Sequence, residues 1–331
     1  MPKRDKIALV NAGGQILIKR APNGETAFIG GEGKDEEVLA LLPDDVREKV
    51  FLINWSSQPL SHATLRMCSD LVQLAGAQVA DGAAGVVVTA ETSTLDELSY
   101  FADLVWSYPQ PLVFAASMNY AGPATSVDLT RAVQAAVSRS CWGQGALLCF
   151  NDGVYTASDV AQISNCRRGG FRSLKAGPLA EFLEPNGELV QRRSARRGKV
   201  MDISIQPASR VEIIEACVGG GDLILGALIE SKGAELNGLV LSAFGGGDVP
   251  PSWVPFLRKL LRDDVPIVAS SRCTAGRIQE ERDFEGSAKR LLEMGIMSGG
   301  ALSPVQARAR LAIGIGAKLS KQDLKDYMLG S

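Results

Sequence analysis

The sequence predicts a two-domain α/β fold, with a large N-terminal domain built on a parallel-rich sheet and a smaller C-terminal α/β domain. The chain has 331 residues, which is more than a single compact core usually holds. Short apolar runs without polar alternation are followed by segments of helical periodicity, a pattern typical of parallel strands covered on both faces. The 35 glycines suit a fold with many tight turns.

The first half of the chain alternates between predicted strands and predicted helices. Apolar runs predict buried strands at residues 7–10, 50–53, 84–88, 111–115 and 145–150. Helical spacing predicts helices over 61–76, over about 95–106, and around Leu129, Val133 and Val137. Strands linked through helices form parallel sheets, and such sheets bind ligands at the carboxyl ends of their strands. We therefore expect the functional site at that edge.

The segment over 184–207 interrupts this alternation. It contains a Pro-Asn-Gly turn and a basic run over 191–199, with few apolar residues. A basic run can bind phosphate or nucleic acid, but this one is short and the net charge of the chain is −2, so we favour a solvated hairpin or linker. We place the N-terminal domain at 1–184, the linker at 185–209 and the C-terminal domain at 210–331.

The second domain repeats the pattern on a smaller scale. Strands are predicted at 211–215, 238–242 and 266–270, and a last helical region over 303 to about 319. Ser303 followed by Pro304 predicts a helix N-cap with proline at the first helical position.

Composition argues against several classes of function. His62 is the only histidine, which leaves no histidine triad and no zinc site with several imidazoles; we expect it on the surface near a helix start. Six cysteines without CxxC spacing indicate thiols in a reducing cytoplasm. No apolar stretch approaches the roughly 20 residues that span a bilayer. We expect no metal, cofactor, nucleic acid or membrane partner.

The loop after the first predicted strand carries a family signature. Asn11-Ala12-Gly13-Gly14-Gln15-Ile16 resembles the Gly-Thr-Gly-Gly-Thr-Ile motif of the bacterial-type L-asparaginase/glutaminase family. Further resemblances follow in order along nearly the whole chain, at residues 55–58, 85–94, 150–152 with 157–160, 244–250, 270–273 and 302–308. This ordered series resembles the family far more specifically than one glycine motif does.

The resemblance implies an intimate homodimer, often paired into a tetramer, with an amino-acid-like ligand. The active site would lie at the carboxyl ends of N-domain strands, closed by a mobile loop and completed by the partner's C-domain. The loop would be residues 17–33 here, rich in glycine and charge as a lid requires. The lid tyrosine of the family has no counterpart, because no tyrosine precedes Tyr100.

The family's chemistry is not preserved. Its mechanism needs a threonine nucleophile and a second threonine with aspartate and lysine that move protons. Ala12 stands at the first threonine; Thr92 matches the second, but Ser93 and Gln162 stand at the aspartate and lysine. Losing one member of a buried ion pair costs about 3–5 kcal/mol, whereas losing both avoids that cost. We therefore interpret the site as neutral, with Ser93 and Gln162 lining it, although an alignment offset at Gln162 is an open alternative.

Other matching positions predict a ligand site. Backbone N–H groups around Ala12, Gly13 and Thr92 are expected to hold a carboxylate or a developing oxyanion. Ser57 and Gln58 are expected to bind the amino-acid end of the ligand, and Ser117 is expected to be a further ligand-binding residue.

Two acidic residues stand where the family has other types. Asp248 replaces an asparagine and would face the ligand's ammonium group from the neighbouring chain. Glu91 beside Thr92 is either a catalytic base or a solvent-facing loop acid.

Three functions remain. The first is a redirected enzyme, which either uses Thr92 and Glu91 as nucleophile and base or promotes cyclisation or elimination by binding alone. The second is a catalytically silent protein that binds an amino-acid-like ligand or a partner protein. The third is a working asparaginase or glutaminase with a displaced nucleophile. We rank them in this order, because likeness of fold does not transfer function when the site differs.

Overall fold

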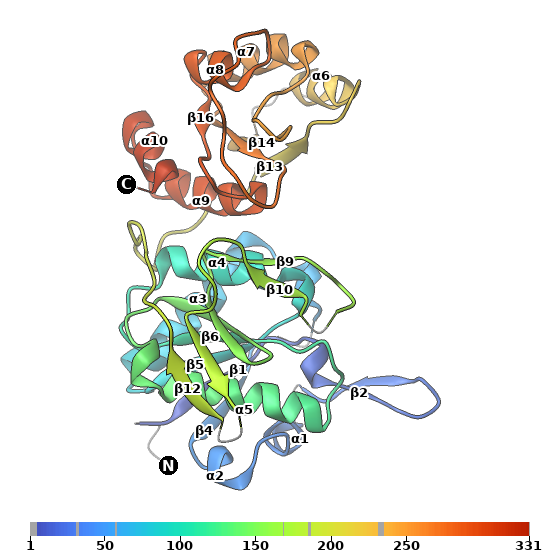
Figure 1. Ribbon diagram of the computed structural model, residues 1–331, viewed down its shortest axis with the longest axis vertical. Coiled ribbons are helices and arrows are strands. Elements are labelled where there is room, and N and C mark those ends of the chain that lie inside the picture. The colour runs from blue at the N-terminus through green and yellow to red at the C-terminus, as the bar shows by residue number, and fades with distance from the viewer. Residues whose placement is uncertain are drawn as a thin grey trace. The chain divides into compact units, whose positions relative to one another are not determined.

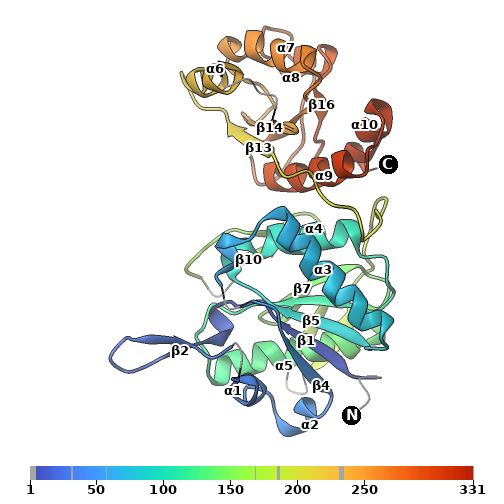
Figure 2. The same ribbon diagram turned by 180° about the vertical axis from the view of Figure 1, so that it is seen from behind.

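The computed structural model (Figures 1 and 2) describes residues 5–30, 33–56, 58–167, 169–184, 187–230 and 235–330. The chain divides into two compact units, residues 1–204 and 205–331. Each unit has its own apolar core.

The first unit is built on an eight-stranded sheet of order β12-β11-β8-β7-β6-β5-β1-β4. The five strands from β7 to β4 run parallel, and the remaining pairs are antiparallel. The strands are β1 (Ile7–Asn11), β4 (Val50–Asn54), β5 (Gly85–Thr89), β6 (Leu112–Ala115), β7 (Ala146–Phe150), β8 (Gly153–Thr156), β11 (Ala180–Leu183) and β12 (Glu188–Gln191). The predicted parallel-rich sheet is confirmed, and every residue of β1, β5, β6 and β7 is buried.

Helices cover both faces of this sheet (Figures 1 and 2). Helices α3 (Leu65–Ala80) and α4 (Leu95–Val105) pack together on one face, and α5 (Pro123–Val137) contacts β1, β5, β6 and β7 from the other. Short elements complete the unit: α1 (Asp35–Leu39), α2 (Asp44–Arg47), η1 (Gln15–Leu17), η2 (Leu60–His62), η3 (Thr92–Thr94), η4 (Arg139–Cys141), β2 (Ile18–Arg20), β3 (Thr26–Phe28), β9 (Val160–Gln162) and β10 (Phe171–Ser173).

Helix α3 differs from the predicted helix at both ends. It begins at Leu65 because the Thr64 side chain accepts the N–H of Met67 at 3.2 Å as an N-cap. His62 therefore lies in the preceding 3-10 turn, where it is exposed. The helix continues past Gly76 to Ala80, and a Cβ at Gly76 would lie 2.8 Å from Ile203 and 3.0 Å from Tyr108. This glycine permits close packing and does not end the helix.

The basic run is held against the first unit. Strand β12 extends to Gln191, and the following arginines form ion pairs within the unit. Arg193 pairs with Asp159 at 3.4 Å, and Arg197 pairs with Asp103 at 2.9 Å, with 21% and 17% of the two arginine side chains exposed. The expectation of a solvated segment is therefore wrong for these two side chains, because each bonds to a mostly buried aspartate.

The second unit contains a four-stranded parallel sheet of order β13-β14-β15-β16. Its elements are β13 (Val211–Glu215), α6 (Asp222–Glu230), β14 (Gly238–Ala243), η5 (Pro251–Trp253), α7 (Val254–Arg262), β15 (Ile267–Ser271), α8 (Ala288–Glu293), β16 (Met297–Ser298), α9 (Pro304–Gly316) and α10 (Lys321–Leu329). The predicted N-cap is confirmed: Ser303 and Gln306 form a capping box at the start of α9.

Across the described ranges, no helix has the length and apolarity that a membrane span needs. In the same ranges, no three His, Cys, Asp or Glu side chains gather as metal ligands.

Candidate functional site

The turn after β1 lies directly against the end of β5. Gly13 and Gly14 have φ of +93° and +96°, a region that favours glycine. A Cβ at Gly14 would lie 2.3 Å from the carbonyl oxygen of Ala90. The sequence therefore needs glycine here both for the turn and for the contact between the two strand ends.

The polar backbone groups of this turn are paired within the chain. The N–H of Ala12 donates to Thr89 Oγ1 at 3.2 Å, and the N–H of Gly13 donates to Asn11 Oδ1 at 3.0 Å. Ala12 has no exposed surface, and Gly13 is buried. Two of the donors that we expected to hold a ligand anion, the N–H groups of Ala12 and Gly13, are thus already hydrogen-bonded in this structure.

The turn after β5 presents reactive side chains. Glu91 precedes the 3-10 turn η3, and Thr92 opens it; both residues are half-buried. Neither side chain forms a hydrogen bond or ion pair with any residue that the structure describes. Ser93 is exposed, and the buried Oγ1 of Thr94 has no hydrogen-bond partner among the described residues.

Gln162, at the predicted lysine position, ends β9. Its backbone N–H donates to Asp96 Oδ2 at 3.2 Å, and its Nε2 donates to the Ser164 carbonyl at 3.4 Å. Within the described chain, no hydrogen bond joins Gln162 to Ser93. The side-chain amide is therefore bonded within its own hairpin, and Asp96 contacts its backbone.

Two further predicted ligand-binding residues, Gln58 and Ser117, lie on different loops. Ser57 lies outside the described residues. Gln58 is exposed, and its carbonyl oxygen would lie 3.6 Å from a Cβ at Gly13, so the two segments are neighbours. Ser117 is buried after β6, where its Oγ accepts the N–H of Asn119 at 3.1 Å.

Asp248 belongs to the second unit, between β14 and η5. It is buried, its Oδ1 accepts the N–H of Ala288 at 3.1 Å, and its Oδ2 pairs with Arg282 at 2.5 Å. Because Ala288 is the first residue of α8, the carboxylate also lies at the positive end of that helix. Its predicted role toward a neighbouring chain's ligand stays a prediction.

Comparison with known proteins decides the family. The model for the asparaginase N-terminal domain matches residues 6–195, and that for the glutaminase/asparaginase C-terminal domain matches residues 210–328. This chain belongs to the asparaginase family. It is 27% identical over 325 residues to an L-asparaginase of Bacillus licheniformis, covering 97% of this chain and 98% of that one. It is 27% identical over 285 residues to a glutaminase-asparaginase of Pseudomonas aeruginosa, covering 83% of this chain and 77% of that one.

A solved structure supports the fold of this asparaginase-family chain. A probable cytoplasmic L-asparaginase from Campylobacter jejuni superimposes with a TM-score of 0.85 and 21% identity, covering 99% of this chain and all of that one. The two-domain asparaginase fold is therefore shown. The named relatives are amidohydrolases, which is the coarse chemistry of the family.

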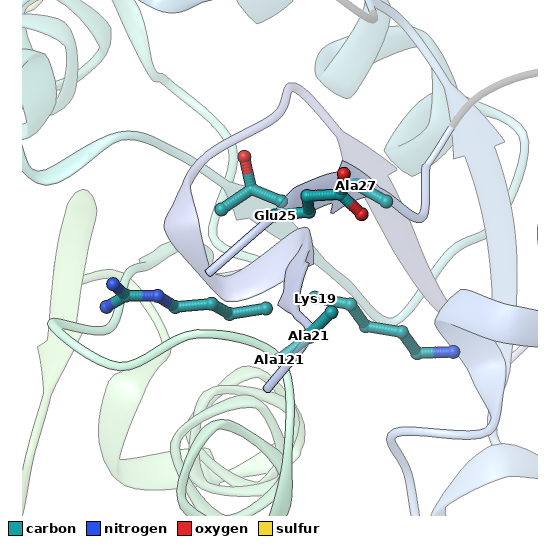
Figure 3. Close-up of a pocket in the computed structure, with 7 residues that line it drawn as sticks. Lys19, Ala21, Glu25, Ala27 and Ala121 are labelled. Carbon is teal, nitrogen blue, oxygen red and sulfur yellow. The ribbon is translucent and has the colours of Figure 1, made fainter. Parts of the chain in front are cut away.

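Within the segment that the resemblance assigns to the lid, residues 18–28 form the β2–β3 hairpin; residues 31 and 32 lie outside the described residues. An open hollow of about 790 Å³ lies beside the hairpin (Figure 3), lined by Lys19, Arg20, Ala21, Glu25, Thr26, Ala27 and Ala121. Lys19 pairs with Glu37 at 3.0 Å, and the Arg20 guanidinium lies 5.5 Å from the Tyr120 ring centre. These side chains hold the hairpin to its neighbours through charge and ring contacts.

Sequence reasoning missed Asn11 and Thr89. Their side chains pair the N–H groups of the β1 turn. A signal existed for Asn11, because asparagine readily bonds the backbone N–H two residues ahead. No comparable signal exists for Thr89, which is 77 residues from its partner.

Proposed function

We propose that this asparaginase-family protein binds an amino-acid-like amide or lactam at the carboxyl ends of β1 and β5. It acts on that ligand through Thr92, without the ordinary hydrolysis of L-asparagine or L-glutamine. One observation carries the proposal. At the β1 turn, residue 12 is alanine and the N–H groups of Ala12 and Gly13 are already hydrogen-bonded, whereas Thr92 is half-buried and its hydroxyl bonds to no described residue. The names of the relatives, L-asparaginase and glutaminase-asparaginase, support an amide ligand.

The proposed reaction is acyl transfer. Thr92 Oγ1 attacks the carbonyl carbon, and its proton passes to the Glu91 carboxylate, because an alcohol needs a base to become a good nucleophile. Glu91 then protonates the leaving nitrogen as the C–N bond breaks. Water attacks the resulting Thr92 ester with Glu91 as base, which releases the acid and restores the hydroxyl.

A second candidate is ligand binding without turnover. It is favoured by the internal pairing of the Ala12 and Gly13 N–H groups. Hydrogen-bond donors directed at the developing oxyanion supply a large part of the catalysis of acyl transfer. A site with fewer such donors is better suited to binding than to chemistry.

One experiment separates the two candidates. Thermal-shift screening of the full chain against amino acids, their amides and small lactams identifies compounds that stabilise the fold. Mass spectrometry then shows whether each such compound is converted. Conversion that disappears in Thr92→Ala and persists in Ser93→Ala supports the enzyme. Stabilisation without conversion supports the silent protein, and conversion that Thr92→Ala leaves intact contradicts the role of Thr92.

We also propose that the protein is a homodimer or a dimer of dimers in the cytoplasm. Helix α6 and the residues before it expose large apolar side chains: Val218 is 95% exposed, Leu223 84% and Ile224 63%. Exposed apolar groups that gather in one segment are typical of interaction surfaces. The six cysteines, all within the described ranges, form no disulfide, as a reducing compartment favours. Light scattering should show an oligomer that Leu223→Lys weakens; a monomeric wild-type protein would contradict the proposal.

A further inference from the structure

Asn11, the last residue of β1, has a side chain that the proposed function does not use. It is fully buried, and its Oδ1 accepts the N–H of Gly13 at 3.0 Å. Its Nδ2 donates to Asn54 Oδ1 at 2.9 Å. The first of these bonds is an Asx turn, in which a side chain replaces a backbone or ligand acceptor. The Asn11 side chain thus already accepts the hydrogen bond that the Gly13 N–H, next to residue 12, can donate.

The carboxamide of Asn11 is held in place by the chain returning from the hairpin. A Cβ at Gly30 would lie 2.2 Å from Asn11 Nδ2, so the backbone there lies directly against the amide. Asn54 in turn donates its Nδ2 to Asp35 Oδ1 at 2.7 Å, at the start of α1. With contacts from three segments, the amide has little rotational freedom, and the Gly13 N–H stays paired.

The N–H of Ala12 is paired as well, through Thr89. Residues 12 and 13 therefore offer a ligand neither a hydroxyl nor an unpaired N–H. A carboxylate or carboxamide oxygen placed against these two residues would lose water without gaining a hydrogen bond from them. Such an unmade bond weakens binding by about tenfold.

We propose that Asn11 is a specificity-determining residue. By holding the Gly13 N–H, it makes the site select ligands that present hydrocarbon, rather than a carboxylate or carboxamide, to the β1 turn. A lactam with one carboxylate has this chemistry, since its ring methylenes can face the β1 turn while its amide faces Thr92. This inference rests on the proposed function and names its ligand class.

Calorimetric titration of the full chain with L-aspartate and with 5-oxo-L-proline, a lactam acid, tests the proposal. Asn11→Ala frees the Gly13 N–H, and the affinity for L-aspartate relative to the lactam should rise about tenfold. Asn11→Asp keeps an acceptor for that N–H, so the ratio should not rise. Asn54→Ala is the matched control: it removes a neighbouring contact and keeps the Gly13 bond, so the ratio should stay unchanged.

A second measurement needs no ligand. In Asn11→Ala, the rate of amide hydrogen exchange at Gly13 should rise at least about tenfold relative to the rate at Leu9 in β1. Leu9 is the reference because its exchange reports any general loss of stability. Binding of both compounds with an unchanged ratio contradicts the role of Asn11, and so does unchanged exchange at Gly13. Absence of binding by both compounds in every variant contradicts instead the proposed function.

Discussion

The turns after β1 and β5 lie against each other, yet they use their polar groups in opposite ways. At the β1 turn, the N–H groups of Ala12 and Gly13 bond to side chains of the protein itself. At the β5 turn, the side chains of Glu91 and Thr92 are half-buried and bond to no residue in the described parts of the chain. A buried polar group is normally paired, so the β1 turn is built for stability. The unpaired groups of the β5 turn are those available to a ligand.

This difference shows how the β1 turn is built around alanine at residue 12. The glycine pair and the contact with Ala90 shape the turn. Asn11 and Thr89 accept hydrogen bonds from the N–H groups of Gly13 and Ala12. The Thr92 hydroxyl, in the turn after β5, has no partner in the described parts of the chain.

The largest effect should come from forcing the two turns apart. Gly14→Ala places a Cβ 2.3 Å from the Ala90 carbonyl oxygen at a φ of +96°, which should lower the free energy of unfolding by more than about 3 kcal/mol. Gly24→Ala is the control, because φ is +89° there but no atom lies within 4 Å of the added Cβ. It should cost only about 1–2 kcal/mol of backbone strain. Equal losses in urea unfolding would show that the contact between the turns is unimportant.

The same substitution at two threonines sharpens the comparison. Thr89→Val removes the acceptor of a buried N–H and should destabilise the protein by about 1–3 kcal/mol. Thr92→Val removes a hydroxyl without a described partner, so its effect on stability should stay within about 0.5 kcal/mol. Denaturant midpoints of the two variants measure this difference. A Thr92→Val variant as unstable as Thr89→Val would mean that Thr92 is structural.

The smallest effect concerns the reactivity of buried cysteines beneath both turns, which alkylating reagents should not reach in the native protein. Burial raises the pKa of the Cys141 thiol to about 12 and raises that of the buried Cys149 thiol as well. Both should resist alkylation at pH 8.5, whereas the exposed Cys166, Cys217 and Cys273 should react, as peptide mapping would show. The raised pKa favours the folded state fully below pH 9, and this contribution is lost as pH rises from about 9 through 12. Rapid labelling of Cys149 in the native protein would contradict a closed sheet.

The sequence determined the framework well and the site only in part. Long apolar runs predicted β1, β5, β6 and β7, because a strand buried on both faces has no polar alternation. Helix α10 was not predicted, although Ser320 caps it. The predicted end of α3 is Gly76, but this residue lies inside the helix, where the distant Tyr108 packs against it. Such contacts between remote residues leave no local signal.

The site shows the same limit. The residues at positions 12, 92, 93 and 162 follow from the motif, but their partners do not. That Gln162 bonds Ser164 and that Asp248 pairs with Arg282 depends on side-chain geometry. Asn11 is the exception, since an Asx turn is local and its residue type indicates it.

Ammonia release by the purified full chain from L-asparagine and L-glutamine tests the central claim most directly. We predict no release above the rate without protein, because no hydroxyl stands at residue 12 to attack the amide. Rapid release from either amino acid, at rates comparable to those of an L-asparaginase measured alongside, would contradict the account.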